Sequence, residues 1–208
     1  MKHLQFSYEL NSEATTIGWA TAVFTLDGER HELAHAYTFH PLRTVATIAL
    51  RIAKGIGVPP TSAVFDEEPS GYIAQFVQRD PTIFTLTEYK DIWDAKRGFE
   101  HAVSIVSEEI ESLPFAVSVA RALHLLYRRH GELGFLRRWN RFSFPMRHYW
   151  HLRLLLDSSP LIDELSDVEE SKIGECEAKL LLAEPAWSAQ RLAGGIRDIE
   201  LPEDVLIE

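Results

Sequence analysis

The sequence predicts an α+β protein in which a largely antiparallel sheet is followed by a helical C-terminal half. Leu4, Phe6, Tyr8 and Leu10 alternate with polar residues, and further short apolar runs follow up to residue 89, which is typical of half-buried strands. From about residue 96, apolar residues recur every three or four positions, which is typical of helices. We therefore expect a sheet domain over residues 1–95 and a helical region over residues 96–208 that packs on or beside it.

The first half predicts a six-stranded, mostly antiparallel sheet with one crossing helix, in the order β-β-β-α-β-β-β. Asp27-Gly28 lies between two apolar runs and indicates a hairpin. Pro41 suits the first turn of a helix, and Gly55 suits its end. The expected strands are residues 4–10, 19–26, 30–39, 62–65, 72–79 and 82–89, and the expected helix is residues 41–55.

The second half predicts helices only. Phe99, Val103, Val106 and Ile110 have helical spacing, and a second apolar series ends before Gly131. Ser166 begins a capping box ahead of a further helix. The expected helices are residues 99–110, 115–131, 132–142, 145–156, 166–182 and 185–192.

The segment His31-Glu32-Leu33-Ala34-His35 matches the H-E-x-x-H zinc-protease signature. That signature works only on a helix, where one turn brings both imidazoles to one metal ion. On the expected strand, His31 and His35 share a face but lie about 13 Å apart, at about 3.3 Å per residue. The sequence therefore favours no metal and no cofactor here. Zinc bound by His31 and His35, with Glu32 as the base of a hydrolase, is the alternative.

Charge is unevenly distributed along a chain whose net charge is −10. Residues 1–120 carry −7, residues 121–156 carry +7, and residues 157–208 carry −10. Segment 127–153 alternates arginine with aromatic residues, as nucleic-acid surfaces do. On helices, the same pattern places aromatics in the core and arginines in water. The basic patch comprises Arg128, Arg129, Arg137, Arg138 and Arg141.

The remaining motifs indicate a cytoplasmic protein that is not embedded in a membrane. The N-terminus has no apolar stretch typical of a signal peptide. A single cysteine, Cys176, indicates a reduced chain with a packed thiol. The phosphate-binding and nucleophile motifs of common enzymes are absent from the sequence.

Residues 28–79 resemble a group of small uncharacterised bacterial proteins. In that group a hairpin precedes a helix that opens with Asp-x-Leu, and a Glu-Glu-Pro-Gly-x-Tyr turn follows. This chain has His40-Pro41-Leu42 and Glu67-Glu68-Pro69-Ser70-Gly71-Tyr72 at these places, so His40 replaces the acid and Ser70 is inserted. The resemblance implies an α+β fold and a hairpin without metal, and it implies no activity. Small acidic bacterial proteins of this kind include suspected immunity proteins of toxin systems.

We expect a non-enzymatic binding protein, immunity-like or an adaptor, that uses acidic surfaces to engage a protein partner. The partner is a basic toxin or a second copy of this chain, and nucleic acid is the alternative ligand. Acidic surfaces increase the association rate with basic partners. The candidate contact residues are Asp66, Glu67, Glu68, Glu164, Asp167, Glu169 and Glu170.

Overall fold

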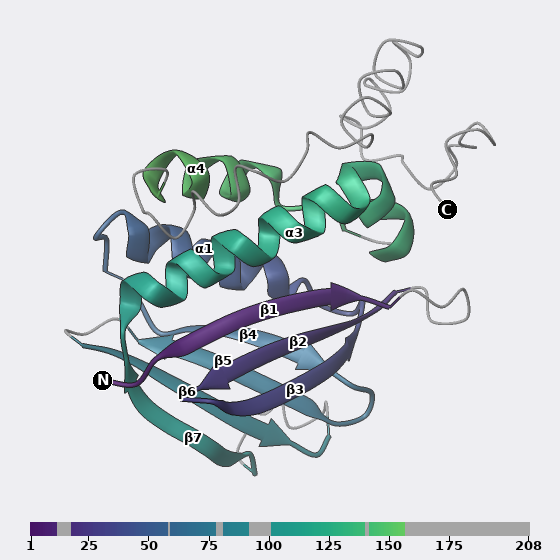
Figure 1. The fold of residues 1–208 in the computed structure, drawn as a ribbon. Coiled ribbons are helices and arrows are strands. Elements are labelled where there is room, and N and C mark those ends of the chain that lie inside the picture. The colour runs from purple at the N-terminus through teal and green to yellow at the C-terminus, as the bar shows by residue number, and fades with distance from the viewer. Residues whose placement is uncertain (12–17, 58, 78–80, 92–100, 140–141, 157–208) are drawn as a thin grey trace, which may run out of the picture. The chain divides into compact units, whose positions relative to one another are not determined.

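The protein has two antiparallel sheets with helices on one side (Figure 1). The computed structural model describes residues 1–11, 18–57, 59–77, 81–91, 101–139 and 142–156. All of these lie within one compact unit. The elements are β1 (Leu4–Leu10), β2 (Trp19–Leu26), β3 (Glu29–Ala36), α1 (Pro41–Ala53), β4 (Thr61–Asp66), β5 (Gly71–Val77), β6 (Thr82–Tyr89), β7 (Val103–Ile110), α3 (Ser112–Trp139) and α4 (Met146–Leu156).

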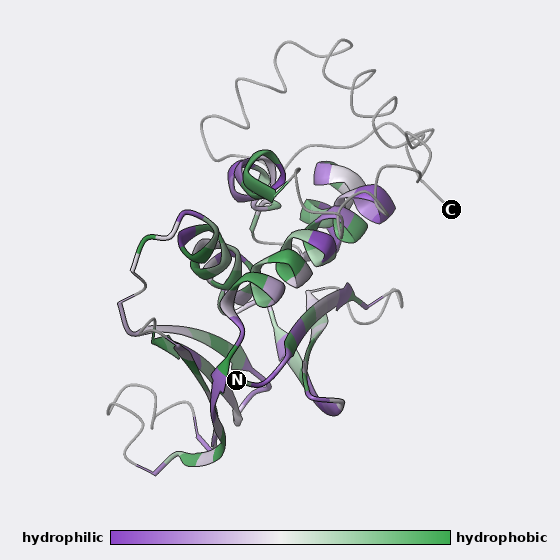
Figure 2. Ribbon diagram, turned by 60° about the vertical axis from the view of Figure 1, so that its left-hand side comes forward, coloured by the Kyte–Doolittle hydropathy of each residue, from purple (hydrophilic) through white to green (hydrophobic). Residues whose placement is uncertain are grey.

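The α+β class is confirmed, but the expectation of one six-stranded sheet is wrong. Strands β1, β2 and β3 form one sheet, and β4 to β7 form a second sheet in sequence order. Figure 2 shows the two sheets as separate layers below the helices. They are bridged at one corner, where the Lys2 backbone N–H donates to the Glu109 carbonyl oxygen at 2.7 Å. Strands β1 to β6 each bury side chains on one face, and closing two sheets on a shared core buries these faces.

Aromatic residues from both sheets form the centre of that core. Phe24 of β2 packs against Phe65 at a centroid distance of 5.8 Å, Phe76 at 6.4 Å and Phe84 at 5.2 Å. Phe115 of α3 stacks on Phe76 at 4.8 Å. The sheets and the long helix are therefore held together by one aromatic cluster.

The helical expectation for residues 99–110 is wrong where the structure describes it, because Val103–Ile110 is strand β7. Its apolar spacing fits a helix, but its Val and Ile residues also favour extended backbone. Pairing with β6 completes the ladder, with Leu86 opposite Val106. A tertiary pairing thus overrides a local pattern. Ile110 is buried while most of β7 is exposed, as expected for an edge strand.

The other helices follow their sequence signals. In α1, Pro41 occupies the first turn, and His40 Nδ1 accepts a hydrogen bond from the Arg43 backbone N–H at 3.4 Å. Within α3 the backbone of Gly131 is not helical (φ 61°, ψ −175°), so α3 consists of two helices that meet at a kink, at the glycine where we expected one helix to end and the next to begin. Helix α4 matches the expected helix over 145–156. The expected helices 166–182 and 185–192 lie outside the described residues.

Helix α3 covers the free edge of β1. The Phe6 backbone N–H donates to Ser118 Oγ at 2.9 Å, and Ser118 Oγ donates to the Phe115 carbonyl oxygen at 2.8 Å. An uncovered strand edge invites pairing with other chains. One serine hydroxyl therefore joins the helix to the strand and occupies a backbone donor of the edge.

Stability should fall as the pH falls below 7, because His35 is fully buried in the core. Burial lowers the pKa of His35 from 6.5 to about 3. Between these values the unfolded chain binds a proton that the folded chain does not, so acid favours unfolding. His35 alone should cost about 2 kcal/mol at pH 5 relative to pH 7. Urea unfolding at both pH values measures this loss, and it should be smaller in His35→Phe. An equal loss in both proteins would contradict it.

Candidate functional site

The H-E-x-x-H segment lies on strand β3, as expected for the hairpin. His31, Leu33 and His35 lie on the same, inward face of the strand, and Glu32 is exposed. Glu32 Oε1 is 2.8 Å from Arg30 Nε on the outer face. The glutamate and the two histidines therefore point to opposite faces of the strand. The zinc-protease arrangement requires all three at one metal ion, so this geometry does not support the zinc alternative.

Within the described part of the chain, no group of three or more His, Cys, Asp or Glu side chains is placed to hold a metal ion. His35 instead lies among aromatic rings, 5.4 Å from Tyr8, 5.2 Å from Phe65 and 5.2 Å from Trp139 between centroids. His35 Nδ1 lies 3.4 Å from the Ala36 carbonyl oxygen, to which it donates as a neutral ring. This histidine belongs to the core.

Asp66 is also buried rather than at the surface, where the sequence placed it as a partner contact. Its Oδ2 accepts a hydrogen bond from the Thr38 hydroxyl at 2.7 Å. Its Oδ1 accepts from the Tyr89 hydroxyl and from the Glu68 backbone N–H, both at 3.2 Å. Because a buried carboxylate needs such donors, Asp66 supports the structure around it and offers no exposed surface for a contact.

The Asp66 carboxylate organises the turn between β4 and β5. The Glu67 backbone N–H donates to the Ser70 carbonyl oxygen at 2.8 Å. Glu68 has a positive φ of 44°, and Asp66 accepts its backbone N–H. Gly71 lies directly against the Phe65 carbonyl oxygen and the Tyr89 hydroxyl, where a Cβ atom would clash. The turn is therefore rigidly positioned.

This turn presents what we call the acidic turn: Glu67, Glu68 and Glu88, with Tyr72. Tyr72 pairs with Glu88 across β5 and β6. Burial raises the pKa of Glu67, and the Glu88 carboxylate raises it further. Burial also raises the pKa of Tyr72, and Glu67 and Glu88 contribute. Two carboxylates thus share a partly desolvated patch, which would be stabilised by a positive group. The other acidic candidates, Glu164, Asp167, Glu169 and Glu170, lie outside the described residues.

The arginines expected to form one basic patch lie on both sides of the Gly131 kink in α3. Arg128 and Arg129 precede the kink, and Arg137 and Arg138 follow it. Arg129 and Arg137 are exposed, whereas Arg128 and Arg138 are half-buried. Arg138 Nη1 donates to the Asn11 carbonyl oxygen at 3.5 Å. Arg141 lies outside the described residues.

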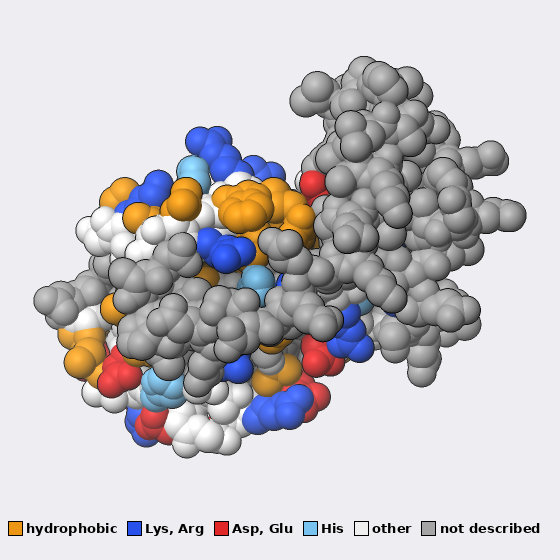
Figure 3. All heavy atoms as spheres, turned by 45° about the horizontal axis from the view of Figure 1, so that its top comes forward, with side chains coloured by type: hydrophobic (Ala, Val, Ile, Leu, Met, Phe, Trp, Pro, Cys, Tyr) orange, Lys and Arg blue, Asp and Glu red, His pale blue; other side chains and the backbone are white. Residues whose placement is uncertain are grey.

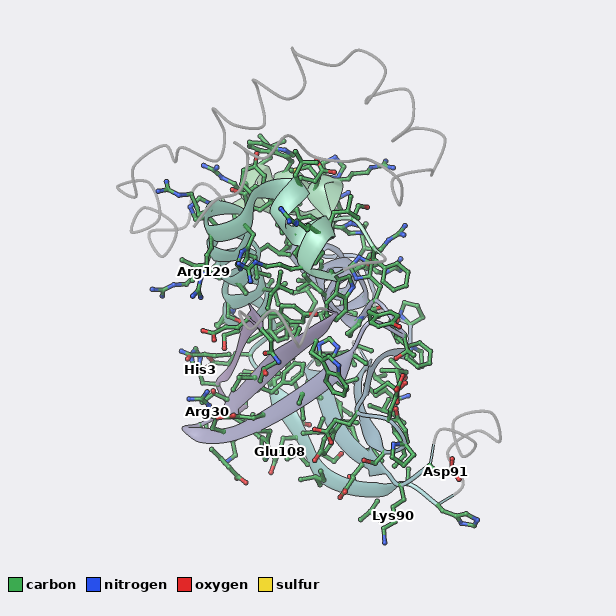
Figure 4. The ribbon with its side chains drawn as sticks, turned by 90° about the vertical axis from the view of Figure 1, so that its right-hand side faces the viewer. His3, Arg30, Lys90, Asp91, Glu108 and Arg129 are labelled. Carbon is green, nitrogen blue, oxygen red and sulfur yellow. The ribbon has the colours of Figure 1, made fainter. Side chains whose placement is uncertain are left out.

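The wider pattern is a separation of charge between helices and strands. Helices α1, α3 and α4 carry nine arginines and one glutamate, whereas the seven strands carry seven acidic residues and one arginine. Figure 4 shows Arg129 in the helical layer and Glu108 on the sheet side. Partners of opposite charge would therefore be attracted to different sides of this unit.

Helix α4 presents an exposed surface that we call the α4 face: Arg147, Trp150, Arg153, Leu154 and Leu155. The sequence placed the first three of these in segment 127–153 as a nucleic-acid surface, but it did not predict an apolar surface here. Trp150 is 47% exposed and Leu154 is 73% exposed. Arg153 lies over the Trp150 ring, with its guanidinium carbon 5.6 Å from the centroid. Figure 3 shows hydrophobic side chains gathered beside basic ones on the helical side. The signal was present, because α4 has apolar residues all round while only one side of a helix can pack inward.

Helices α3 and α4 are joined behind the α4 face. His124 Nδ1 and the Tyr149 hydroxyl are 2.7 Å apart, and Arg153 Nη1 donates to the same hydroxyl at 3.3 Å. Burial raises the pKa of Tyr149, while Arg153 opposes the shift. The α4 face is thus anchored by buried polar contacts, which hold its exposed residues in a fixed arrangement.

No protein-family model, curated protein or solved structure matches the chain. Among the helices that the structure describes, none combines the length and the apolar character needed to cross a membrane.

Replacing Asp66 with alanine should destabilise the protein by about 3 kcal/mol, because the Thr38 hydroxyl loses its buried acceptor and the turn loses its backbone contact. Glu88→Ala is the control, since Glu88 is exposed and should change stability by less than about 0.5 kcal/mol. Urea denaturation measures both. A similar small loss in Asp66→Ala would show that the network does not stabilise the fold.

Proposed function

We propose that this is a non-enzymatic binding protein that engages a protein partner through the α4 face. The observation that carries the proposal is the exposure of Trp150, Leu154 and Leu155 beside Arg147 and Arg153. Tryptophan and arginine dominate the energetics of protein interfaces. Contiguous exposed apolar residues with a polar rim are typical of interaction sites. The sequence predicted a binding protein with an acidic contact surface, and the α4 face is a different surface.

The surrounding charge indicates the chemistry of the partner. The three helices carry a large excess of arginine. A partner with an acidic rim and an apolar centre would complement both features of the α4 face. A second copy of the chain meets this description only if it offers its acidic sheet side, so the contact would be heterologous.

Nucleic acid fits this surface less well. The aromatic residues that alternate with arginine along 127–153 are mostly within the core: Trp139 and Tyr149 are buried, and Tyr127 is half-buried. Base stacking requires accessible rings. Trp150 is exposed, but Arg153 already lies over it.

A photo-reactive residue at Leu154 should capture the partner in the native host. A second protein with the same residue at Leu113, which is 56% exposed at the start of α3, is the matched control. We expect a product that is specific to position 154 and identifiable by mass spectrometry. Trp150→Ala should then weaken affinity for the isolated partner by about 30-fold, corresponding to an interface hot spot of about 2 kcal/mol. Equal capture at both positions would contradict the proposal.

The acidic turn supports a second candidate, the immunity-like function with a basic partner. The observation that favours it is the support of Glu68 by the buried Asp66 and of Glu67 by the Ser70 carbonyl oxygen, both through backbone N–H groups. A preorganised charged surface loses little entropy on binding. This candidate uses the opposite charge and different residues from the α4 face.

The two candidates respond oppositely to charge removal. The double variant Glu67→Gln/Glu88→Gln, which keeps only Glu68 of the acidic turn, should weaken the salt dependence of association with a basic partner and slow association at low salt about 10-fold. It should leave binding of a partner to the α4 face unchanged. Trp150→Ala should weaken binding to the α4 face and leave association of the basic partner with the acidic turn unchanged. Surface plasmon resonance at several salt concentrations measures both variants. If both variants change binding of one partner to the same extent, the acidic turn and the α4 face do not act as separate sites.

A further inference from the structure

Three buried side chains meet where the end of α3 packs against β1 and β3. The ring centroids of Tyr8 and His35 are 5.4 Å apart, those of His35 and Trp139 are 5.2 Å apart, and those of Tyr8 and Trp139 are 6.2 Å apart. His35 and Trp139 are fully buried, and Tyr8 is 4% exposed. Each ring therefore lies in contact distance of the other two and is shielded from solvent.

Each of the three rings carries a polar atom without a hydrogen-bond partner among the described residues. The atoms are Tyr8 Oη, His35 Nε2 and Trp139 Nε1. Buried polar atoms are nearly always hydrogen-bonded, to protein or to an internal water. Among the described atoms of this kind, these three lie on rings that contact one another, so a single bound molecule can serve all three.

The bonding capacities of these atoms define what would satisfy them. His35 Nδ1 donates to the Ala36 carbonyl oxygen, so Nε2 of the neutral ring is an acceptor. Burial lowers the pKa of His35 to about 3, which keeps the ring neutral near pH 7. Trp139 Nε1 is a donor only, and the Tyr8 hydroxyl both donates and accepts. A molecule that donates to His35 and accepts from Trp139 would therefore complete the set.

The three groups do not suit an ion. They provide a single imidazole nitrogen and no carboxylate, whereas metal ions in proteins take three or four such ligands. They also provide no positive charge for an anion. Water is neutral, both donates and accepts, and is the usual occupant of buried polar sites in proteins.

We propose that Tyr8, His35 and Trp139 form a binding site for one internal water molecule. The water donates to His35 Nε2, accepts from Trp139 Nε1, and bonds the Tyr8 hydroxyl. It joins β1, β3 and the end of α3 through hydrogen bonds at a place where the surrounding contacts are aromatic.

The substitution Tyr8→Phe tests the site by the sign of its effect. If the hydroxyl bonds a water, its removal should lower the urea midpoint of unfolding. If the hydroxyl is simply unsatisfied, its removal should raise the midpoint, because a costly buried polar group is lost. Tyr37→Phe removes a hydroxyl from a tyrosine that is 39% exposed and should leave the midpoint unchanged. A raised midpoint in Tyr8→Phe overturns the proposal.

A direct Tyr8–His35 hydrogen bond would also lower the midpoint, so the water itself must be measured. Oxygen-17 relaxation dispersion of the solvent should show one fewer long-lived water in Tyr8→Phe than in the wild type and in Tyr37→Phe. The Trp139 indole N–H resonance should cross-relax with water in the wild type and shift in Tyr8→Phe. A lowered midpoint without loss of a long-lived water, or an unshifted indole resonance, overturns the proposal in favour of the direct bond.

Discussion

The contact between Phe24 and the three phenylalanines of the second sheet is the interaction on which the rest of the structure depends. Each sheet has an apolar face, and such a face must be buried against another layer. The two sheets meet through these rings, and α3 joins the same cluster through Phe115. The position of every candidate site follows from this packing, since the acidic turn ends strands of one sheet and α4 rests on the helices that cover both.

The core also explains why buried polar groups occur where they do. Asp66 lies at the end of β4, where a carboxylate can collect donors from β6, from the turn and from Thr38. His35 lies at the end of β3, where the same core provides rings instead of donors. The two residues are equally inaccessible, yet the Asp66 carboxylate is bonded by protein donors at both oxygens, whereas His35 has a protein partner at Nδ1 alone among the described residues. The difference arises from their neighbours and not from their burial.

Sequence reasoning could predict elements whose signals are local. The alternation in Leu4–Leu10, the Asp27-Gly28 turn and the Pro41 helix start each depend on neighbouring residues, and all three are observed. It could not predict that β3 and β4 belong to different sheets, because that depends on which faces meet in space. The helix prediction for Val103–Ile110 is wrong for the same reason, because this segment becomes a strand by pairing with β6. At the candidate sites, sequence identified acidic and basic residues but could not tell that Asp66 is buried or that Trp150 is exposed.

The hydrogen bond from Phe6 to Ser118 has a consequence for the order in which this chain can complete its fold during synthesis. The last strand of the first sheet ends at Ala36. The edge strand β1, however, is covered by Ser118, which lies 112 positions after Phe6 in the chain. At about 5–20 residues per second, the ribosome would expose that edge for several seconds before Ser118 is even made. A nascent chain in this interval presents an open hydrogen-bonding row to its neighbours on a polysome. Helix α3 is thus the element whose arrival ends the period in which the protein is most exposed to misassembly.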